Sequence, residues 1–507
     1  MNTRRQPGGM VQRPTIAGAG STRVVSPKLS GSFVPALGNF NIQYNFTSAS
    51  IAVDILSSHE YLGYPLRMEP GWSKTLTLPI VFLGAMVGML FMGRLGDVVG
   101  RARAMRTTLA LTIIGALAPA SAIGDASAVY SIICAGRFVL GIGVGGIYPL
   151  SATWSAEGNQ DAHSRGCRVA FAFFWQTLGQ ASPFGIAMIL MKAFSPTIPA
   201  PWVPDLQFRL LFAFGALPAG IVFLASFRED DSEEFREAAN RRPAGICATI
   251  RQQPKKIRIT LLGTAGSWFL YDIAFYGTST FTPQILERIC LTGTKVRGGC
   301  EQNMFQVAEQ SLIVSLMSIP GCLFAISLIS YIGCKALNIM GFIFLSVTFL
   351  SLAVVWIVDD HAKIALFTIF CVLTFLLNFG PNLGTYVLPA ICFPTRIRST
   401  CHGISATGGK LGAALGAMLF STLRASSVGV VGVLCIQAAV CGFGMIVSWL
   451  FLRHDWEYLN DDSQVTTDIF LHTSVSTQPE TGAVDCGVSI HAECHIEPNV
   501  QSPTWTN

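Results

Sequence analysis

The chain has 507 residues, of which 12% are charged and 51% hydrophobic, with 34 Lys and Arg against 29 Asp and Glu. A soluble domain carries about 25% charged residues, so this composition excludes a chain made only of soluble domains. The apolar residues form long runs and not the ~10-residue alternating segments of a membrane β-barrel. The basic residues are scattered and form no single stripe, which argues against a nucleic-acid partner. The sequence therefore predicts an all-α membrane protein whose solvent is the lipid bilayer.

Membrane-spanning helices need about 20 mainly apolar residues, and twelve such runs can be counted. A polar segment, 229–257, separates a first half, 33–228, from a second half, 258–452. Six helices plus six is the outline of an internally repeated carrier, with its substrate held between the halves near the bilayer midplane. The runs are 33–56, 75–95, 104–123, 128–152, 168–192, 208–228, 258–283, 308–332, 336–358, 363–389, 402–424 and 426–452.

The loops between the runs predict the orientation. Basic residues gather in the loops after the second, fourth and tenth runs, and by the positive-inside rule these loops are cytosolic. Both termini and segment 229–257 are then cytosolic as well, and the plasma membrane is the default location. Residues 1–32 are an N-terminal tail, and 453–507 are a Ser/Thr/Asp/Glu-rich tail that we expect to be disordered. The basic residues are Arg94, Arg101, Arg103, Arg106, Arg165, Arg168, Arg396 and Arg398.

Two cysteines differ from the rest of the fourteen. Most of the cysteines lie in or beside apolar runs, where Cys behaves as a small hydrophobic residue. Cys290 and Cys300 instead flank a short polar segment after the seventh run, on the predicted extracytosolic side. That compartment can be oxidising, so we expect a disulfide between them, with two free thiols as the alternative.

The turn between the second and third runs reads Gly93-Arg-Leu-Gly-Asp97-Val-Val-Gly100-Arg101. An ordinary basic cytosolic loop would explain the charges alone. The order of Gly, Asp, Gly and Arg resembles the loop motif of the major facilitator superfamily, with a partial echo at Gly333-Cys-Lys in the second half. The resemblance implies a twelve-helix major facilitator fold, in which Gly93, Asp97, Gly100 and Arg101 control conformational change without touching substrate.

The fourth run contains a formal G-x-G-x-x-G at 141–146. No strand or acidic residue of a dinucleotide-binding unit surrounds it, so we interpret it as a membrane helix. Gly141 and Gly145 are four residues apart and can form a face for close helix packing. Arg137 lies ~13 Å into this span at 1.5 Å per residue, where an unpaired charge is costly, so we expect it to face a cavity.

Two longer signatures narrow the resemblance. The fourth run continues as Tyr148-Pro-Leu-Ser-Ala, and the tenth and eleventh runs carry Gly-Pro-Asn at 380–382 and FPTRIRST at 393–400, followed by HGISA at 402–406 and Gly409-Lys410. These stretches resemble the phosphate:proton symporters within the major facilitator superfamily. The resemblance spans both halves, roughly 33–452.

Trp268, Asp272 and Tyr276 follow one another at four-residue spacing in the seventh run, which keeps them on one helical face. A charged Asp in mid-membrane costs ~2.5 to 3.5 kcal/mol, so it should be protonated, paired or in a wet cavity. A purely structural ion pair is the alternative. The resemblance implies that all three residues line the phosphate site and that Asp272 carries the proton.

Four further residues complete the candidate substrate site. Lys410, in the eleventh run, can bind an anion or neutralise Asp272, although a lysine that extends to the interface is an equal alternative. Tyr148 and Gln176 are included because they resemble site residues of the symporters. Asn382 can bond substrate or repair a break in the tenth helix.

The chain departs from the symporters where they carry acids. Asn45 and Ile147 stand at two first-half positions, and Ile391 at one in the second half. Fewer groups remain to hold a proton, so proton coupling is left open.

We therefore expect a secondary active transporter of inorganic phosphate or a phosphorylated small molecule, without enzyme activity, cofactor or metal site. The alternatives are a carrier for another organic solute, such as a sugar or an organic anion, and a nutrient sensor that binds without transporting.

Overall fold

The computed structural model describes residues 30–453, apart from a set of short gaps. The predicted tails, 1–32 and 453–507, fall almost wholly outside the described residues, as does part of the central segment 229–257. The gaps are 59–65, 74, 158–161, 195–199, 229, 232–234, 237–245, 293, 297–298, 302, 360, 425 and 427.

The first half forms helices close to the predicted runs. The sixth run is divided at Phe214 and Gly215 into two consecutive helices. The helices are α1 (Ser30–Ser57), α2 (Ile80–Val99), α3 (Arg101–Ala120), α4 (Ala126–Ala156), α5 (Ala162–Ala193), α6 (Trp202–Ala213) and α7 (Ala216–Ser226).

The second half shows features that the sequence analysis did not predict. A short helix, α9 (Ile246–Arg251), lies in the predicted polar segment, and an antiparallel hairpin of β1 (Thr294–Val296) and β2 (Gly299–Glu301) follows the seventh run. The tenth run is divided at Gly380, because Pro381 has no backbone N–H with which to continue the helix. The other helices are α10 (Lys255–Ser279), α11 (Thr282–Ile289), α12 (Met304–Leu316), α13 (Ser318–Val358), α14 (Lys363–Phe379), α15 (Pro381–Cys392), α16 (Arg398–Arg424) and α17 (Gly429–Phe451).

Counting α6–α7, α10–α11 and α14–α15 as one span each, dividing α12–α13 at Gly333 and leaving out the short α9 gives twelve spans within the described residues. Gly333 has φ 78° inside α13, and Gly100, with φ 109°, joins α2 to α3. Only glycine adopts these angles readily, so each half contains a glycine turn between two helices. By length and hydropathy alone, six stretches of the described chain qualify as spans, and Met304–Val358 counts as one of them. Several remaining helices are too polar for that criterion, because they carry the buried polar residues described below.

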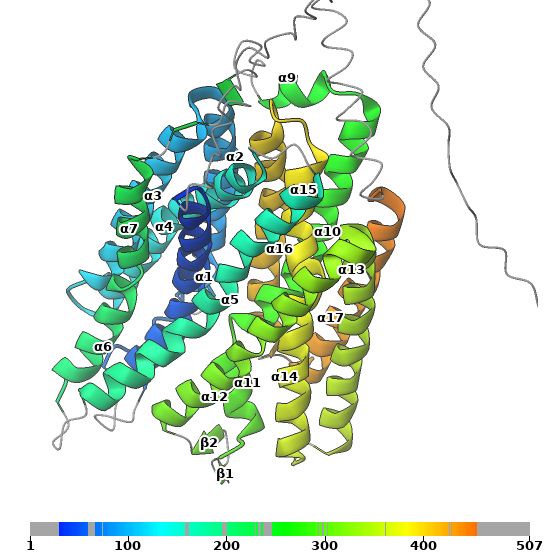
Figure 1. The fold of residues 1–507 in the computed structure, drawn as a ribbon. Helices are drawn as coiled ribbons and strands as arrows, with labels where there is room; N and C mark the ends of the chain where they lie inside the picture. Colours follow the sequence, from blue (N-terminus) through cyan, green and yellow to red (C-terminus); the bar gives the residue numbers. More distant parts are fainter. Residues whose placement is uncertain are drawn as a thin grey trace, which may run out of the picture. The chain divides into compact units, whose positions relative to one another are not determined.

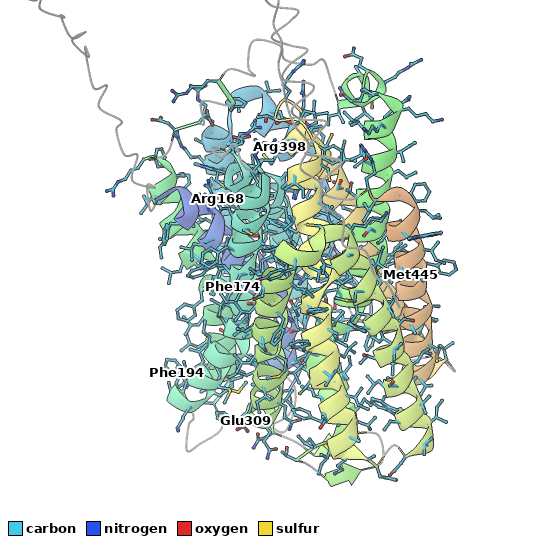
Figure 2. The ribbon with its side chains drawn as sticks, turned by 45° about the vertical axis from the view of Figure 1, so that its right-hand side comes forward. Arg168, Phe174, Phe194, Glu309, Arg398 and Met445 are labelled. Carbon is cyan, nitrogen blue, oxygen red and sulfur yellow. A yellow bond between two sulfur atoms is a disulfide. The ribbon has the colours of Figure 1, made fainter. Side chains whose placement is uncertain are left out.

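The helices run between two ends of the molecule (Figure 1). Arg168 and Arg398 lie towards the end that holds the α2–α3 turn, and Phe194 and Glu309 lie towards the end that holds the β hairpin (Figure 2). We call these the turn end and the hairpin end. Outer helices expose large apolar side chains, as expected where a helix faces lipid. They include Leu217, Ile221 and Leu224 on α7, Val347, Leu350 and Val354 on α13, and Phe443, Ile446 and Trp449 on α17.

Glycines allow close approach of helix pairs in both halves. A Cβ added at Gly141 or Gly145 would collide with backbone atoms of α2, so the predicted packing face on the fourth run is confirmed. A Cβ at Gly412 or Gly416 would likewise collide with backbone atoms of α10. The resulting α10–α16 contact positions the polar site at the centre of the molecule.

Candidate functional site

A buried ion pair joins α10 and α16. Lys410 Nζ lies 2.7 Å from Asp272 Oδ2, and the two side chains are only 1% and 2% exposed. Lys410 also donates to the Tyr276 hydroxyl at 3.1 Å. Charges removed from water need such close, hydrogen-bonded partners to offset their lost hydration. The structure thus brings three of the predicted site residues together.

Aromatic rings from both halves enclose the Lys410 ammonium. Its nitrogen lies 4.2 Å from the ring centroid of Tyr276, 4.9 Å from that of Tyr148 and 5.6 Å from that of Phe46, within the range of cation–π attraction. The Tyr148 hydroxyl is 3.3 Å from the Tyr276 hydroxyl. Because Tyr148 and Phe46 belong to the first half, Lys410 lies at the interface between the halves.

Trp268 lies one helical turn before Asp272 on α10. Its ring contacts Tyr148 edge-on at 6.1 Å between centroids, and the His402 ring at 5.5 Å. The predicted face of Trp268, Asp272 and Tyr276 therefore points at α4 and α16. His402 was part of a recognised signature but was not expected at the site.

Gln176 belongs to a network of neutral polar groups beside the ion pair. Its Nε2 donates to Asn39 Oδ1 at 2.8 Å. Asn39 Nδ2 in turn donates to the Tyr386 hydroxyl at 3.1 Å and to Ser151 Oγ at 3.3 Å. Ser151 and Tyr386 are 2.8 Å apart. These contacts connect α1, α4 and α5 of the first half with α15 of the second.

Sequence reasoning missed Asn39, Ser151 and Tyr386 as members of the site. The first run carries four amides, Asn39, Asn41, Gln43 and Asn45, inside a membrane helix, and all four are buried. Buried amides need hydrogen-bond partners, so this run was a usable signal for an interior polar site. Nothing in the local sequence distinguishes Tyr386 from a tyrosine that only packs.

The structure places Asn382 apart from the ion pair. Its Nδ2 donates to Asn378 Oδ1 at 2.8 Å, and Asn378 Nδ2 donates to the Thr374 carbonyl at 3.0 Å. This chain of contacts runs along the α14–α15 junction, at the helix break after Phe379. Of the two interpretations of Asn382, the observed contacts correspond to repair of the break.

Arg137 is 1% exposed and binds backbone carbonyls. It donates to Thr77 O at 2.9 Å, Leu78 O at 3.1 Å and Asn45 O at 3.5 Å. We expected this residue to face a cavity, but it instead holds the segment before α2 against α1. Among the described residues, no carboxylate contacts Arg137.

The two first-half positions that lack the symporter acids have packing or hydrogen-bonding roles. Asn45 Nδ2 donates to Asn41 Oδ1 at 2.8 Å and to Gly215 O at 3.1 Å, which ties α1 to the α6–α7 junction. Ile147 is fully buried, and its Cγ2 faces Gly38.

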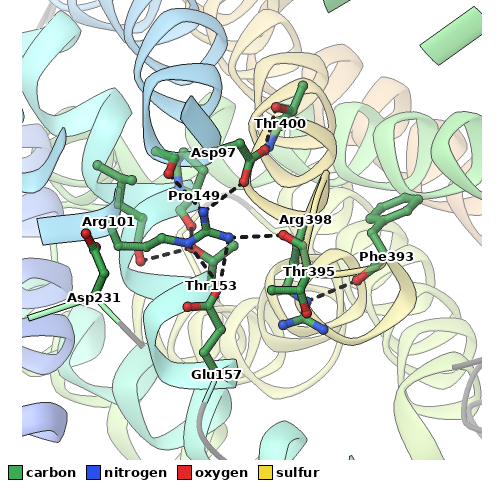
Figure 3. Close-up of polar contacts among 12 residues, drawn as sticks. Asp97, Arg101, Pro149, Thr153, Glu157, Asp231, Phe393, Thr395, Arg398 and Thr400 are labelled. Atoms are coloured by element: carbon green, nitrogen blue, oxygen red, sulfur yellow. Dashed lines mark hydrogen bonds and ion pairs between the residues drawn. The ribbon is translucent and has the colours of Figure 1, made fainter. Parts of the chain in front are cut away.

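At the turn end, Asp97 connects the two halves (Figure 3). Its Oδ2 accepts from the backbone N and the hydroxyl of Thr400, at 2.7 and 2.6 Å, and its Oδ1 lies 3.1 Å from Arg101. Arg101 also lies 2.7 Å from Glu157 and donates to Thr395 O at 3.1 Å. We call these five residues the Asp97 cluster.

The two glycines of the same motif lie where backbones or loops approach closely. A Cβ at Gly93 would meet the Ser399 carbonyl of α16, and one at Gly100 would meet the Asp231 carboxylate. Asp231 Oδ1 accepts from Ala102 N at 3.0 Å, at the first turn of α3, where a negative charge is favoured.

At the hairpin end, a second contact joins the halves. Gln284 of α11 donates to both carboxylate oxygens of Asp54 of α1, at 2.9 and 3.1 Å. Cys290 and Cys300 form a disulfide with 5.6 Å between their Cα atoms, which confirms the predicted pair. Contacts therefore join the halves at both ends, and Lys410 and Asp272 are buried between them.

Comparisons with known proteins give the family. A model of the family "Sugar (and other) transporter" matches residues 31–243 and 299–454. "Inorganic phosphate transporter PT2" of Toxoplasma gondii is 35% identical over 75% of this chain, which covers 64% of that protein's length. "Low affinity inorganic phosphate transporter 1" of Petunia hybrida is 30% identical over 76% of this chain and 81% of its own length.

Solved structures give the same fold. The proton:xylose symporter XylE has a TM-score of 0.67 at 17% identity, with 84% of this chain and 96% of that chain covered. A partially occluded inward-open form of XylE from E. coli has a TM-score of 0.64 at 17% identity, with 84% and 98% covered. At this identity the likeness shows the fold alone.

The relatives are named as transporters, so a carrier rather than an enzyme is confirmed, as is the resemblance to phosphate transporters. The predicted major facilitator fold of two six-helix halves is confirmed as well. Since the family model matches more than half of the sequence, this chain belongs to the sugar (and other) transporter family and is an integral, multi-pass transporter of the major facilitator superfamily.

Proposed function

We propose that this transporter moves inorganic phosphate by alternating access. The observation that carries the proposal is the Asp272–Lys410 pair, enclosed at the interface of the halves. An incoming anion can replace the carboxylate as the partner of Lys410, and the displaced Asp272 can take up a proton to stay neutral. The names of the relatives support phosphate as the anion.

The neighbouring residues supply hydrogen bonds to the anion. Tyr148, Gln176, Trp268 and Tyr276 surround Lys410 and Asp272 on both sides of the interface, so each half holds part of the substrate. Binding by both halves couples occupancy to their relative movement, since a ligand shifts conformations only through different contacts in each.

The rocking units are 33–228 and 258–452, and the Asp97 cluster controls the turn end. The hydrogen bonds from Thr400 to Asp97 and from Arg101 to the Thr395 carbonyl, together with the close approach at Gly93, hold α2 and α3 against the start of α16. They break when that end opens, so Asp97 and Arg101 set the balance between conformations without contacting substrate.

The topology follows from the distribution of arginines. The turn end is cytosolic, because the basic loops lie there, and both termini and segment 229–257 share that side. The hairpin end is extracytosolic, in keeping with a disulfide at that end. The plasma membrane is the proposed location.

Uptake of labelled phosphate by proteoliposomes tests the function. The unmodified protein should take up labelled phosphate, and Lys410→Met should abolish uptake. Lys255→Met, at the exposed start of α10, is the matched control and should leave uptake unchanged. Phosphate binding without uptake would instead indicate a sensor. If phosphate is neither bound nor taken up, the substrate is another solute.

A further inference from the structure

A row of polar side chains follows one face of α1. Gln43, Thr47, Ser50 and Asp54 are separated by four, three and four residues, which keeps them on one side of the helix. The first three are buried, and Asp54 is partly buried. At 1.5 Å per residue the row extends over ~16 Å, from the level of the substrate site towards the hairpin end. We call these four residues the polar row.

Both ends of the polar row contact the second half. At the inner end, Gln43 Oε1 accepts from the Tyr276 hydroxyl at 3.5 Å, and that hydroxyl also accepts from Lys410. At the outer end, Gln284 Nε2 donates to the two carboxylate oxygens of Asp54 at 2.9 and 3.1 Å. The row therefore connects the candidate substrate site with the contact between the halves at the hairpin end.

The middle of the polar row bonds within its own helix. Ser50 Oγ donates to the Thr47 carbonyl at 2.9 Å. A hydroxyl bonded in this way is satisfied while the face is covered, and its lone pairs can also accept from water when the face is uncovered. Apolar side chains would stabilise a permanently buried face better, because burying polar groups costs free energy. The row thus fits a face that is covered in one conformation and wet in another.

The Gln284 amide is satisfied on one side. The Asp54 carboxylate can only accept, so the NH2 group of Gln284 must face it, and the carbonyl oxygen Oε1 lies on the other branch. That oxygen is buried and meets no donor among the residues that the structure describes. A buried acceptor without a donor costs free energy, which offsets part of the gain from the bonds to Asp54. Opening this end lets water reach both groups, so the contact can separate readily.

We propose that Asp54 and Gln284 form the gate that closes the transporter at the hairpin end, and that the polar row lines the passage that opens when they separate. This rests on the alternating access of the proposed function. Asp54 belongs to the first half, and Gln284 lies on α11 of the second half. Movement that parts the halves at this end must break their contact, just as opening the turn end must break the Asp97 cluster.

The accessibility of a thiol in the polar row tests the gate. Ser50→Cys introduces the thiol with little change in size. A membrane-impermeant thiol reagent is added on the hairpin side of sealed vesicles, and mass spectrometry of peptides measures the modification at position 50. With the gate intact the thiol should react slowly. Gln284→Leu or Asp54→Leu, each combined with Ser50→Cys, should raise the rate at least roughly fivefold by shifting the population towards the form open at this end.

Two controls separate the gate from general loosening of the fold. Gln306→Leu makes the same replacement at the same end of the second half, but Gln306 bonds Asn303 at the start of its own helix. It should change the rate by less than about twofold. Combining Asp54→Gln with Gln284→Asp reverses the two partners and should return the rate to within about twofold of the intact gate. A role in packing alone would not give this recovery.

The outcomes distinguish the gate from the proposed function. Asp54→Asn keeps one acceptor for Gln284 and should raise the labelling rate about twofold, so it serves where a leucine variant does not fold. The labelling needs no substrate, so lack of phosphate uptake would overturn the proposed function alone. An unchanged rate in all three gate variants, or an equal rise in Gln306→Leu, would overturn the gate and leave the proposed function standing.

Discussion

The two halves share their packing but differ in how they hold charge. In the first half the deeply buried Arg137 donates to three backbone carbonyls. In the second half Lys410 is paired with Asp272 and ringed by aromatic residues. Backbone carbonyls cannot leave their helices, but a carboxylate side chain can exchange with a mobile anion. The difference teaches that Arg137 is structural and that the second-half pair is the charge that substrate can reach.

The largest expected effect comes from removing the second-half carboxylate. Asp272→Asn keeps the size of the side chain but leaves the Lys410 charge buried without a partner, which costs about 3 to 5 kcal/mol. Phosphate uptake driven by a proton gradient should fall at least roughly hundredfold. The fall is measured as the initial rate of phosphate uptake into proteoliposomes.

Two further variants show whether the loss is specific. Asp205→Asn removes the carboxylate of a partly exposed pair with Arg209 and should change uptake little. Asp272→Asn combined with Lys410→Met should recover stability without recovering transport. Full retention of gradient-driven uptake in Asp272→Asn would contradict the assignment of Asp272.

A smaller effect is expected where the halves meet at the turn end. Asp97→Asn removes the ion pair with Arg101 and weakens the bonds to Thr400, so this end should close less stably. Turnover should fall roughly tenfold while the KM for phosphate stays within about twofold, because Asp97 contacts no substrate. Arg103→Ala, at an exposed arginine of the same turn, is the control. A large rise in KM with normal turnover would place Asp97 in the substrate site.

The sequence predicted the helices well and the site in part, for physical reasons. Long apolar runs and the spacing of Trp268, Asp272 and Tyr276 are local patterns, and they led to the second-half site. The partnership of Asn39 with Tyr386 joins positions 347 residues apart, which no local pattern encodes. The same holds for Arg137, whose depth in the fourth span was predicted but whose carbonyl partners depend on the path of the chain before α2. A break in the tenth helix was one interpretation of Asn382, but its place at Gly380 was not predicted because an apolar run continues across it.

The variant Ile147→Asp gives the first half a carboxylate at a position where the phosphate:proton symporters carry one. With Arg137 bound to carbonyls and Asn45 and Ile147 uncharged, Asp272 is the main group left to carry a proton. Uptake should therefore tolerate collapse of the pH gradient and approach facilitated diffusion or exchange. Ile147→Asp should increase the dependence on the gradient roughly threefold, since a first-half carboxylate adds a proton-binding group.

Initial uptake rates at several external pH values, in energised and uncoupled vesicles, measure this dependence. Ile147→Asn is the matched control, because it adds a polar group of similar size without a titratable charge. Strict dependence of the unmodified protein on the gradient would show that the second-half pair alone is enough for coupling.

The smallest effect concerns the disulfide, which constrains the second half at the hairpin end. Cys290 ends α11, and Gln284 on that helix bonds Asp54 of the first half, so the disulfide holds a helix that joins the halves. Closing a loop of this length stabilises the segment by about 3 kcal/mol in the chain-entropy view. Replacing both cysteines with serine should speed proteolysis of 284–301 but change the KM for phosphate by less than about twofold, because the substrate site lies elsewhere.

Mass spectrometry after alkylation checks that the disulfide is present: Cys290 and Cys300 should be alkylated only after reduction. If both are alkylated without reduction, the constraint on the second half is absent, and α11 must be held by Gln284 and its packing alone.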